Sequence, residues 1–174
     1  MILLRKTRPE ELDEVMRILA GARDFMHSRR IPQWDNGYPS RELISADMHR
    51  GDSYVLEEPG ALLGVCTVTL LPDPSYAALT EGAWLCADEP YAALHRVAVN
   101  PACRGRGIGR EIFSHAEALA RELGVTSLRG DTHPQNKLMR RLFDASGFTL
   151  CGVIELVNTE ESDTRRIAFQ KVLI

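Results

Sequence analysis

The chain has 174 residues, of which 44% are hydrophobic and 26% charged, and its formal net charge at pH 7 is −3. This length fits one domain with a sizeable core, and the composition excludes a disordered, collagenous or coiled-coil chain. The net charge gives no general attraction to nucleic acid or to an anionic membrane. We therefore expect a single domain over residues 1–174 that binds neither partner.

Features of membrane or secreted proteins are not expected either. The most apolar stretch, residues 60–71, has only the length of a strand, and Arg5 and Lys6 follow the first apolar residues instead of preceding them. The four cysteines are widely spaced, with no C-x-x-C pair. These features predict a cytoplasmic protein with free thiols and no metal.

Charge is distributed unevenly along the chain. Residues 51–95 contain seven acidic residues and no Lys or Arg, whereas residues 96–141 contain nine basic and four acidic residues. Two interpretations remain open at this point. The charges either form ordinary solvated surface or divide the molecule into an anion-binding half and a half that accepts a cation.

Apolar spacing and turn residues predict a mixed α/β layer fold without repeats or linkers. Thr7 and Glu10 form a T-x-x-E capping box around Pro9, which predicts a helix start, and apolar spacing continues that helix to about residue 30. Residues 75–90 are ambiguous, with a short strand predicted near 83–86. The other expected elements are strands at 2–6, 53–57, 61–71, 92–99, 126–130, 148–156 and 164–173, and helices at 40–51, 107–123 and 135–146.

A glycine-rich loop follows the strand at 92–99 and leads directly into a helix. Glycines at 105, 107 and 109 let the backbone approach a ligand, and the helix start adds partial positive charge. Arg104, Arg106 and Arg110 strengthen the preference for an anion.

Two common phosphate motifs are absent from this loop. Arg110 occupies the position where G-x-G-x-x-G requires its third glycine, and no Gly-Lys-Ser/Thr follows. A simple turn would also use these glycines. The placement of the loop between an apolar strand and an amphipathic helix favours a diphosphate site.

Two segments resemble one known family. Residues 104–109, Arg-Gly-Arg-Gly-Ile-Gly, resemble the Arg/Gln-x-x-Gly-x-Gly/Ala signature of the GNAT superfamily of acyl-CoA-dependent N-acetyltransferases. Asn136, Met139, Leu142-Phe143 and Gly147-Phe148 are similar to that family's second conserved block. The resemblance implies a mostly antiparallel, mixed central sheet flanked by about four helices and splayed between its fourth and fifth strands. It also leaves a homodimer through the outer strands open.

The resemblance further implies acetyl-CoA as co-substrate. The backbone of the glycine loop would hold the pyrophosphate, the preceding strand would pair with the pantetheine arm, and the N–H of Val97 would polarise the thioester carbonyl. The implied cofactor-binding residues are Val97, Ala98, Val99, Arg104, Gly105, Arg106, Gly107, Ile108, Gly109, Arg110, Asn136 and Phe143.

The sequence departs from the family pattern at two positions. Phe143 stands where many members carry a tyrosine that protonates the departing thiolate, and Ala93 stands where some carry a glutamate base. Either another group performs these tasks, or the thiolate leaves unaided. The departures keep a second interpretation open, in which the chain is a non-catalytic acyl-CoA-binding or sensing module.

Several residues are candidates for the catalytic base. His95 shares strand parity with Val97, so it either faces the same cleft or packs as a structural histidine. Asp131 follows a short strand, where it either orients His133 or an acceptor, or begins a helix. Glu81 and Glu89 are acidic alternatives with an ordinary surface role as the competing interpretation. We predict His95 and Asp131 as the catalytic residues.

The loop at 31–39 is the predicted wall of the acceptor site. Trp34 and Tyr38 place two aromatic rings beside Asp35, a combination that suits a cationic amine, although the same residues would also fasten the loop to the core. Glu81 and His133 are further candidates for binding the acceptor. The predicted function is acetyl transfer to a primary amine by direct attack, on a small molecule in preference to a protein or peptide N-terminus.

Overall fold

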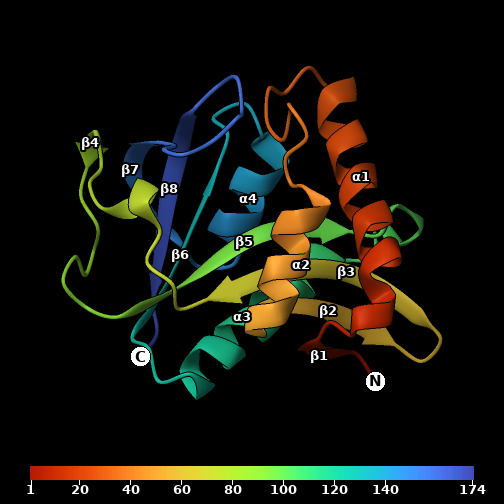
Figure 1. Cartoon of the computed structure of the whole chain (residues 1–174). Coiled ribbons are helices and arrows are strands. Elements are labelled where there is room, and N and C mark those ends of the chain that lie inside the picture. Colours follow the sequence, from red (N-terminus) through yellow and green to blue (C-terminus); the bar gives the residue numbers. More distant parts are fainter.

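In the computed structural model, which describes residues 1–174, strands from both halves of the sequence join in one sheet (Figure 1). Its order is β1-β2-β3-β5-β6-β8-β7-β4, and every neighbouring pair is antiparallel except β5 with β6. The strands are β1 (Leu3–Lys6), β2 (Ser53–Glu58), β3 (Ala61–Thr69), β4 (Glu81–Gly82), β5 (Tyr91–Val99), β6 (Ser127–Thr132), β7 (Thr149–Glu155) and β8 (Arg165–Val172). The mixed, mostly antiparallel sheet is confirmed.

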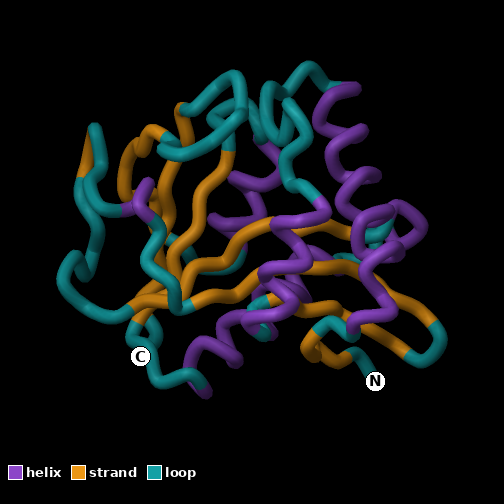
Figure 2. Tube along the Cα trace, in the orientation of Figure 1, coloured by secondary structure: helices purple, strands orange, loops and turns teal.

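Four helices cover the two faces of this sheet (Figure 2). They are α1 (Leu12–Ser28), α2 (Arg41–Arg50), α3 (Ile108–Glu122) and α4 (Lys137–Ala145). One apolar core packs α1 and α2 against β2, β3 and β5, and a second packs α3 and α4 on the opposite face. None of these helices combines the length and the apolar character that crossing a membrane requires.

The sheet opens between β5 and β6, the fourth and fifth strands when the two-residue β4 is left out. These strands pair in parallel only where Tyr91, Ala92 and Ala93 face 127–129. Beyond Ala93, β5 pairs only with β3, and β6 pairs only with β8. The resulting gap, which separates the two halves of the sheet, is the predicted splay.

The helix start at residues 7–12 differs from the predicted capping box. Thr7 bonds Ser53 through its hydroxyl, and the cap is formed instead by Glu11, whose carboxylate accepts from the backbone N–H of Arg8 at 2.8 Å. A short 3₁₀ turn, Pro9–Glu11, precedes α1. Thr7 therefore does not cap the helix, because its hydroxyl is bonded to Ser53 of β2.

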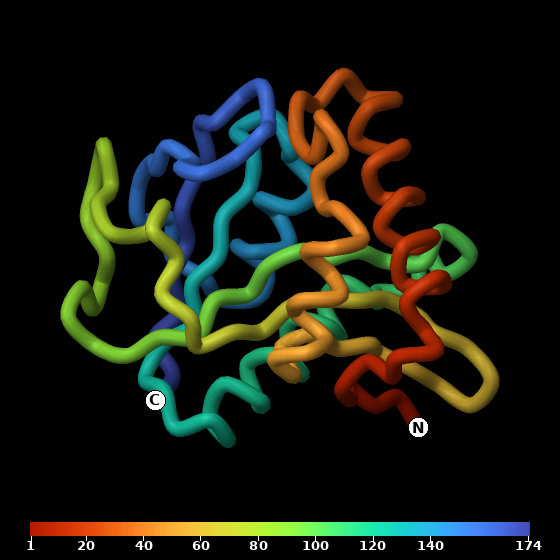
Figure 3. Tube along the Cα trace, viewed as in Figure 1, coloured from red at the N-terminus to blue at the C-terminus, as the bar shows by residue number.

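The segment between β3 and β5 also differs from prediction. The strand expected near 83–86 is wrong, because the pairing residues are Glu81 and Gly82, which join the edge of β7. Figure 3 shows this segment looping out beyond the main sheet before it returns to β5. Trp84 lies just past β4, with its indole N–H donating to the carbonyl of Tyr76 at 2.9 Å. The strand was predicted at the wrong residues because the pairing of Glu81 and Gly82 with β7 depends on the folded sheet.

Candidate active site

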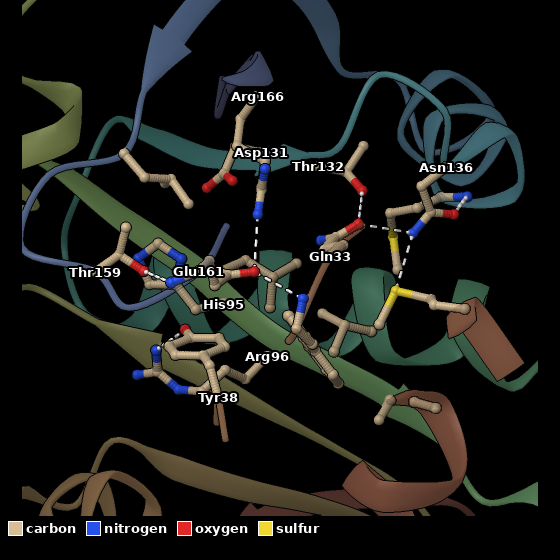
Figure 4. A pocket seen from close by; sticks show the side chains of 18 of the residues that line it. Gln33, Tyr38, His95, Arg96, Asp131, Thr132, Asn136, Thr159, Glu161 and Arg166 are labelled. Atoms are coloured by element: carbon tan, nitrogen blue, oxygen red, sulfur yellow. Dashed lines mark hydrogen bonds and ion pairs between the residues drawn. The ribbon is translucent and has the colours of Figure 1, made fainter. Parts of the chain in front are cut away.

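A cavity of about 780 Å³ fills the opening between β5 and β6 (Figure 4). Its walls come from α1, the loop between α1 and α2, β5, the start of the glycine loop, α4 and the loop between β7 and β8. These segments are far apart in sequence, and they all border the space that opens where β5 and β6 separate.

The β5 wall of the cavity is bent by a β-bulge. The register shifts between Val65 and Thr67 of β3, and Arg96 takes a positive φ of 52° opposite the shift. Residues 94–99 all line the cavity, and the bulge shifts the alternation of side chains, since Leu94 and Val97, three positions apart, both pack against the same core. Because β6 has diverged here, the backbone of these residues presents an unpaired strand edge to the cavity.

The glycine loop lies at the end of this strand and carries unpaired amides. The N–H groups of Gly105, Gly107, Ile108 and Gly109 make no backbone hydrogen bond, although those of Arg106 and Arg110 do. Gly105 and Gly107 have φ of 81° and 76°, and a Cβ at either position would meet nothing within 4 Å. Free amides at a helix start, with open space around both Cβ positions, fit a diphosphate.

The arginines of this loop hold it to neighbouring elements. Arg104 donates to the carbonyl of Gly21 at 3.1 Å and stacks on Phe25 of α1, and Arg106 forms two 3.0 Å contacts with Glu58. Of the predicted cofactor residues, seven line the cavity and five lie outside its wall. The seven are Val97, Ala98, Val99, Arg104, Gly105, Asn136 and Phe143, and the five are Arg106, Gly107, Ile108, Gly109 and Arg110.

Asn136 lies between α4 and a buried glutamine that the sequence analysis missed. Its carbonyl oxygen caps α4 by accepting from Met139, and its amide donates to Gln33 Oε1 at 3.1 Å. The hydroxyl of Thr132 and the backbone N–H of His133 donate to the same oxygen, each at 3.3 Å. Gln33 thus joins the loop after α1 to the end of β6, and no pattern in the sequence indicates this role.

Phe143 forms part of an aromatic cluster beneath the cavity. Its ring stacks on Phe169 with centroids 4.4 Å apart and meets Phe113 and Phe148 edge-on, and the residue is 2% exposed. A Cβ on Gly130 would lie 2.8 Å from this ring. The ring therefore acts as an apolar floor and has no proton to donate.

His95 and Asp131 face the cavity from opposite strands and are joined through other residues. The imidazole Nε2 of His95 lies 3.4 Å from Asp73 Oδ2, and the hydroxyl of Tyr76 donates to Asp131 Oδ1 at 2.5 Å. The ring of Tyr76 is 5.7 Å from that of His95. Asp73, His95 and Asp131 therefore line this part of the cavity, and the buried Tyr76 contacts both His95 and Asp131. Neither Asp73 nor Tyr76 was predicted.

The environment shifts the protonation of this group. Burial lowers the pKa of His95, and the nearby guanidinium of Arg96 lowers it further, while Asp131 and Asp73 oppose the shift. Burial raises the pKa of Asp131 above its ordinary value. A neutral imidazole that is 16% exposed beside a cavity is suited to accepting a proton.

The predicted acceptor wall is divided by the structure. Trp34 and Tyr38 line the cavity, and the hydroxyl of Tyr38 accepts from Arg96 Nη1 at 2.9 Å. Asp35 points elsewhere, since its carboxylate accepts from the backbone N–H of Ser162 at 2.9 Å and also contacts the Ser162 hydroxyl. Asp35 therefore fastens the loop at 31–39 to the loop before β8.

A buried ion pair strengthens the same junction. Glu161 accepts from the backbone N–H of Trp34 at 2.7 Å and from Arg166 Nη2 at 2.8 Å. The side chains of Glu161 and Arg166 are 4% and 1% exposed, and both residues border the cavity. No pattern in the sequence indicated this pair. Glu161 and Arg166 are only five positions apart, but their contact with the loop at 31–39 depends on the fold.

Two predicted acceptor residues lie away from the cavity. His133 is buried and pairs through Nε2 with Asp163 Oδ2 at 2.9 Å, while its Nδ1 accepts from the N–H of Gln135. Glu81 lies on the exposed strand β4, 3.9 Å from Arg165 Nη2. Asp131 orients neither His133 nor a helix start, because it is a residue of β6 bonded to Tyr76.

Comparison with known proteins identifies the fold and the family. The acetyltransferase (GNAT) family model matches residues 20–148. A GNAT-family acetyltransferase structure from Streptococcus agalactiae is 29% identical, with a TM-score of 0.87 over 98% of this chain and 95% of that chain. Among curated proteins, none matches the sequence.

Two further structures share the fold at lower identity. A GNAT-family acetyltransferase from Listeria monocytogenes is 21% identical, with a TM-score of 0.74 over 99% of this chain and 95% of that one. A Salmonella typhimurium structure that holds its cofactor acetyl-CoA is 18% identical, with a TM-score of 0.71 over 100% and 95% of the two chains.

The open β5 edge, the glycine loop with its free amides and the family match agree with one another. This chain belongs to the GNAT family of acetyltransferases, which transfer acetyl groups from acetyl-CoA.

Proposed function

We propose that this protein is a cytoplasmic enzyme that transfers the acetyl group of acetyl-CoA directly to a primary amine of a small molecule. The observation that carries the proposal is the position of His95, whose imidazole faces the same cavity as the unpaired edge of β5. The edge provides a place for a thioester, and the imidazole provides a base for the attacking amine.

The cofactor end of the proposed site consists of backbone groups. The free amides of Gly105, Gly107 and Ile108 would bind the pyrophosphate, and the open edge at Val97 and Val99 would pair with the pantetheine arm. Bound acetyl-CoA supplies the thioester carbon that is attacked. Donation from the N–H of Val97 to its carbonyl oxygen would stabilise the charge that develops there, an interaction of about 2.7–4 kcal/mol.

The proposed reaction removes two protons from the acceptor nitrogen and exchanges one bond. His95, directly or through water, takes the first proton from the acceptor ammonium, and the free amine then attacks the thioester carbon. A C–N bond forms, the C–S bond breaks, and coenzyme A leaves as a thiolate. The nitrogen loses its second proton as the amide forms, and this proton passes to the thiolate directly or through water. Since Phe143 donates no proton, the thiolate departs without help from this residue. A thiol pKa of about 8.5 makes this departure possible.

The loops over the cavity support a small acceptor. The amide of Asn36 donates to the carbonyl of Glu160 at 2.8 Å, and Trp34 and Asp35 bond Glu161 and Ser162 beside it. These bridges join the loop at 31–39 to the loop before β8 above the acceptor end. A lysine on a flat protein surface would have to displace them, whereas a small amine would not.

Calorimetric titration with acetyl-CoA, coenzyme A, ATP and NAD, followed by thiol release with a panel of amines, tests this proposal. We expect saturable binding of the two coenzyme A compounds alone, and thiol release with at least one amine. Binding without any release would favour a non-catalytic acyl-CoA sensor, which the phenylalanine at 143 also suits. No binding of coenzyme A would contradict the proposal at its first step.

A further inference from the structure

The charged groups at the acceptor end of the cavity are unequally compensated, and this inequality restricts the acceptor. Given the proposed function, this inequality bears on the chemical class of the amine. Two guanidinium groups reach this end, from Arg96 and Arg166. Both are neutralised from within the protein.

Arg96 is held by Asp47 of α2, whose side chain is fully buried. Its Nε and Nη2 lie 2.8 Å and 2.7 Å from Asp47 Oδ2, and Nη1 donates to Tyr38. Arg166 is held by Glu161 at 2.8 Å and by the carbonyl of Asp163 at 2.7 Å. Neither guanidinium therefore offers an uncompensated positive charge to a ligand.

The carboxylates of the same wall lack such partners. Asp131 accepts from the neutral hydroxyl of Tyr76. Asp73 accepts from the N–H of Ser75 and lies 3.4 Å from the imidazole of His95. No lysine or arginine makes an ion pair with either side chain. Glu160, an exposed residue, also borders the cavity. A ligand at this end consequently meets negative charge that the protein has left unbalanced.

We propose that the acceptor is an amine whose amine-bearing carbon carries no carboxylate, such as a decarboxylated amino acid, and that free α-amino acids are excluded. The acceptor's ammonium is attracted by Asp73 and Asp131. A carboxylate on the neighbouring carbon enters a partly buried region with negative neighbours and no free cation, so it loses hydration without gaining a partner.

Glu161 is the specificity-determining residue in this arrangement, because it neutralises Arg166, one of the two guanidinium groups at this end of the cavity. Glu161→Gln keeps an oxygen that accepts from the N–H of Trp34 and removes the charge opposite Arg166. The positive charge of Arg166 then becomes available at the cavity wall. This variant should accept α-amino acids better than the wild-type protein does.

The experiment uses four pairs of acceptors that differ only by the carboxylate: tyramine and tyrosine, histamine and histidine, agmatine and arginine, cadaverine and lysine. Thiol release from acetyl-CoA gives kcat/KM for each. We expect a ratio of at least about tenfold in favour of the amine in the pairs that react. Glu161→Gln should reduce that ratio by about tenfold. Glu155→Gln, a change on β7 outside the cavity, should leave it unchanged.

The outcomes separate the inference from the proposed function. Equal or better use of the amino acids would overturn the inference while transfer itself stands. Acetyl-CoA binding without transfer to any of the four amines would also overturn it. Thermal unfolding shows whether the Glu161→Gln protein is folded. If it is folded and its preference for the amine over the amino acid is unchanged, the role given to Arg166 is wrong. The wild-type ratios decide the acceptor class even if that variant does not fold. Absence of acetyl-CoA binding would contradict the proposed function itself.

Discussion

Asp47 on α2 holds the guanidinium of Arg96 on β5, with Oδ2 at 2.8 Å from Nε and 2.7 Å from Nη2. Arg96 is also the bulge residue, with a φ of 52° that few non-glycine residues adopt. The ion pair therefore holds the strained point of the strand that separates His95 from Val97. The proposed base and the proposed thioester contact both depend on this one strand geometry.

Asp47→Ala should destabilise the protein by about 3–5 kcal/mol, because it leaves the buried charge of Arg96 without its partner. Urea unfolding measures the change. Asp52→Ala is the matched control, since Asp52 is more exposed and accepts from Arg50 and Thr69. We expect about 1 kcal/mol there. Equal losses in the two variants would show that the contact to Arg96 has no special weight.

Gly107→Val should abolish measurable coenzyme A binding in calorimetric titration without unfolding the protein. A side chain at this position strains a backbone with a φ of 76° and fills the open space before the free amides. Gly124→Val provides the control, because Gly124 has a φ of 77° at the other end of α3, also with open space around its Cβ position. Gly124→Val should strain the backbone to a similar degree and leave coenzyme A binding unchanged. Unchanged affinity in Gly107→Val would refute our placement of the diphosphate.

The pH dependence of kcat/KM should show an acidic limb below the ordinary histidine pKa of about 6.5. Burial and Arg96 lower the pKa of His95, so its ring stays neutral, and able to accept a proton, at pH values where an ordinary histidine is protonated. Activity is then lost only as the pH falls through the lowered value. Asp73 favours the protonated ring, so Asp73→Asn should move the limb to still lower pH.

His95→Gln is the companion variant for this profile. It should lower kcat by about 100-fold or more and leave coenzyme A affinity unchanged, because it removes a base and no proposed cofactor contact. If the acidic limb persists in the residual activity, another group is the base and His95 has a structural role.

Gly130→Ala should destabilise the protein by about 1–3 kcal/mol, because the added Cβ would lie 2.8 Å from the ring of Phe143. A double-mutant cycle with Phe143→Leu, measured by urea unfolding, checks the cause. The smaller side chain makes room, so the alanine should have a smaller effect in that background. Strict additivity of the two changes would mean that the ring is not what excludes a side chain at Gly130.

The sequence predicted most of the helices and strands and the glycine loop between β5 and α3, because these depend on local patterns. Glycines at 105 and 107 between an apolar strand and an amphipathic helix form a contiguous signal. The strand parity expected for His95 and Val97 does not hold, because the bulge at Arg96 shifts the alternation between them and Val97 packs against the same core as Leu94.

Tertiary structure alone decided the half of the cavity where we place the acceptor. Asp73, Tyr76 and Asp131 meet because β5 and β6 diverge after Ala93, and the Glu161–Arg166 pair reaches the cavity only through the loop at 31–39. The same packing takes Glu81 and His133 elsewhere. Whether a glycine loop leaves a backbone amide free depends on residues that are neighbours in the chain. The net charge of a cavity instead depends on which distant side chains neutralise one another, and that is determined only when the chain is folded.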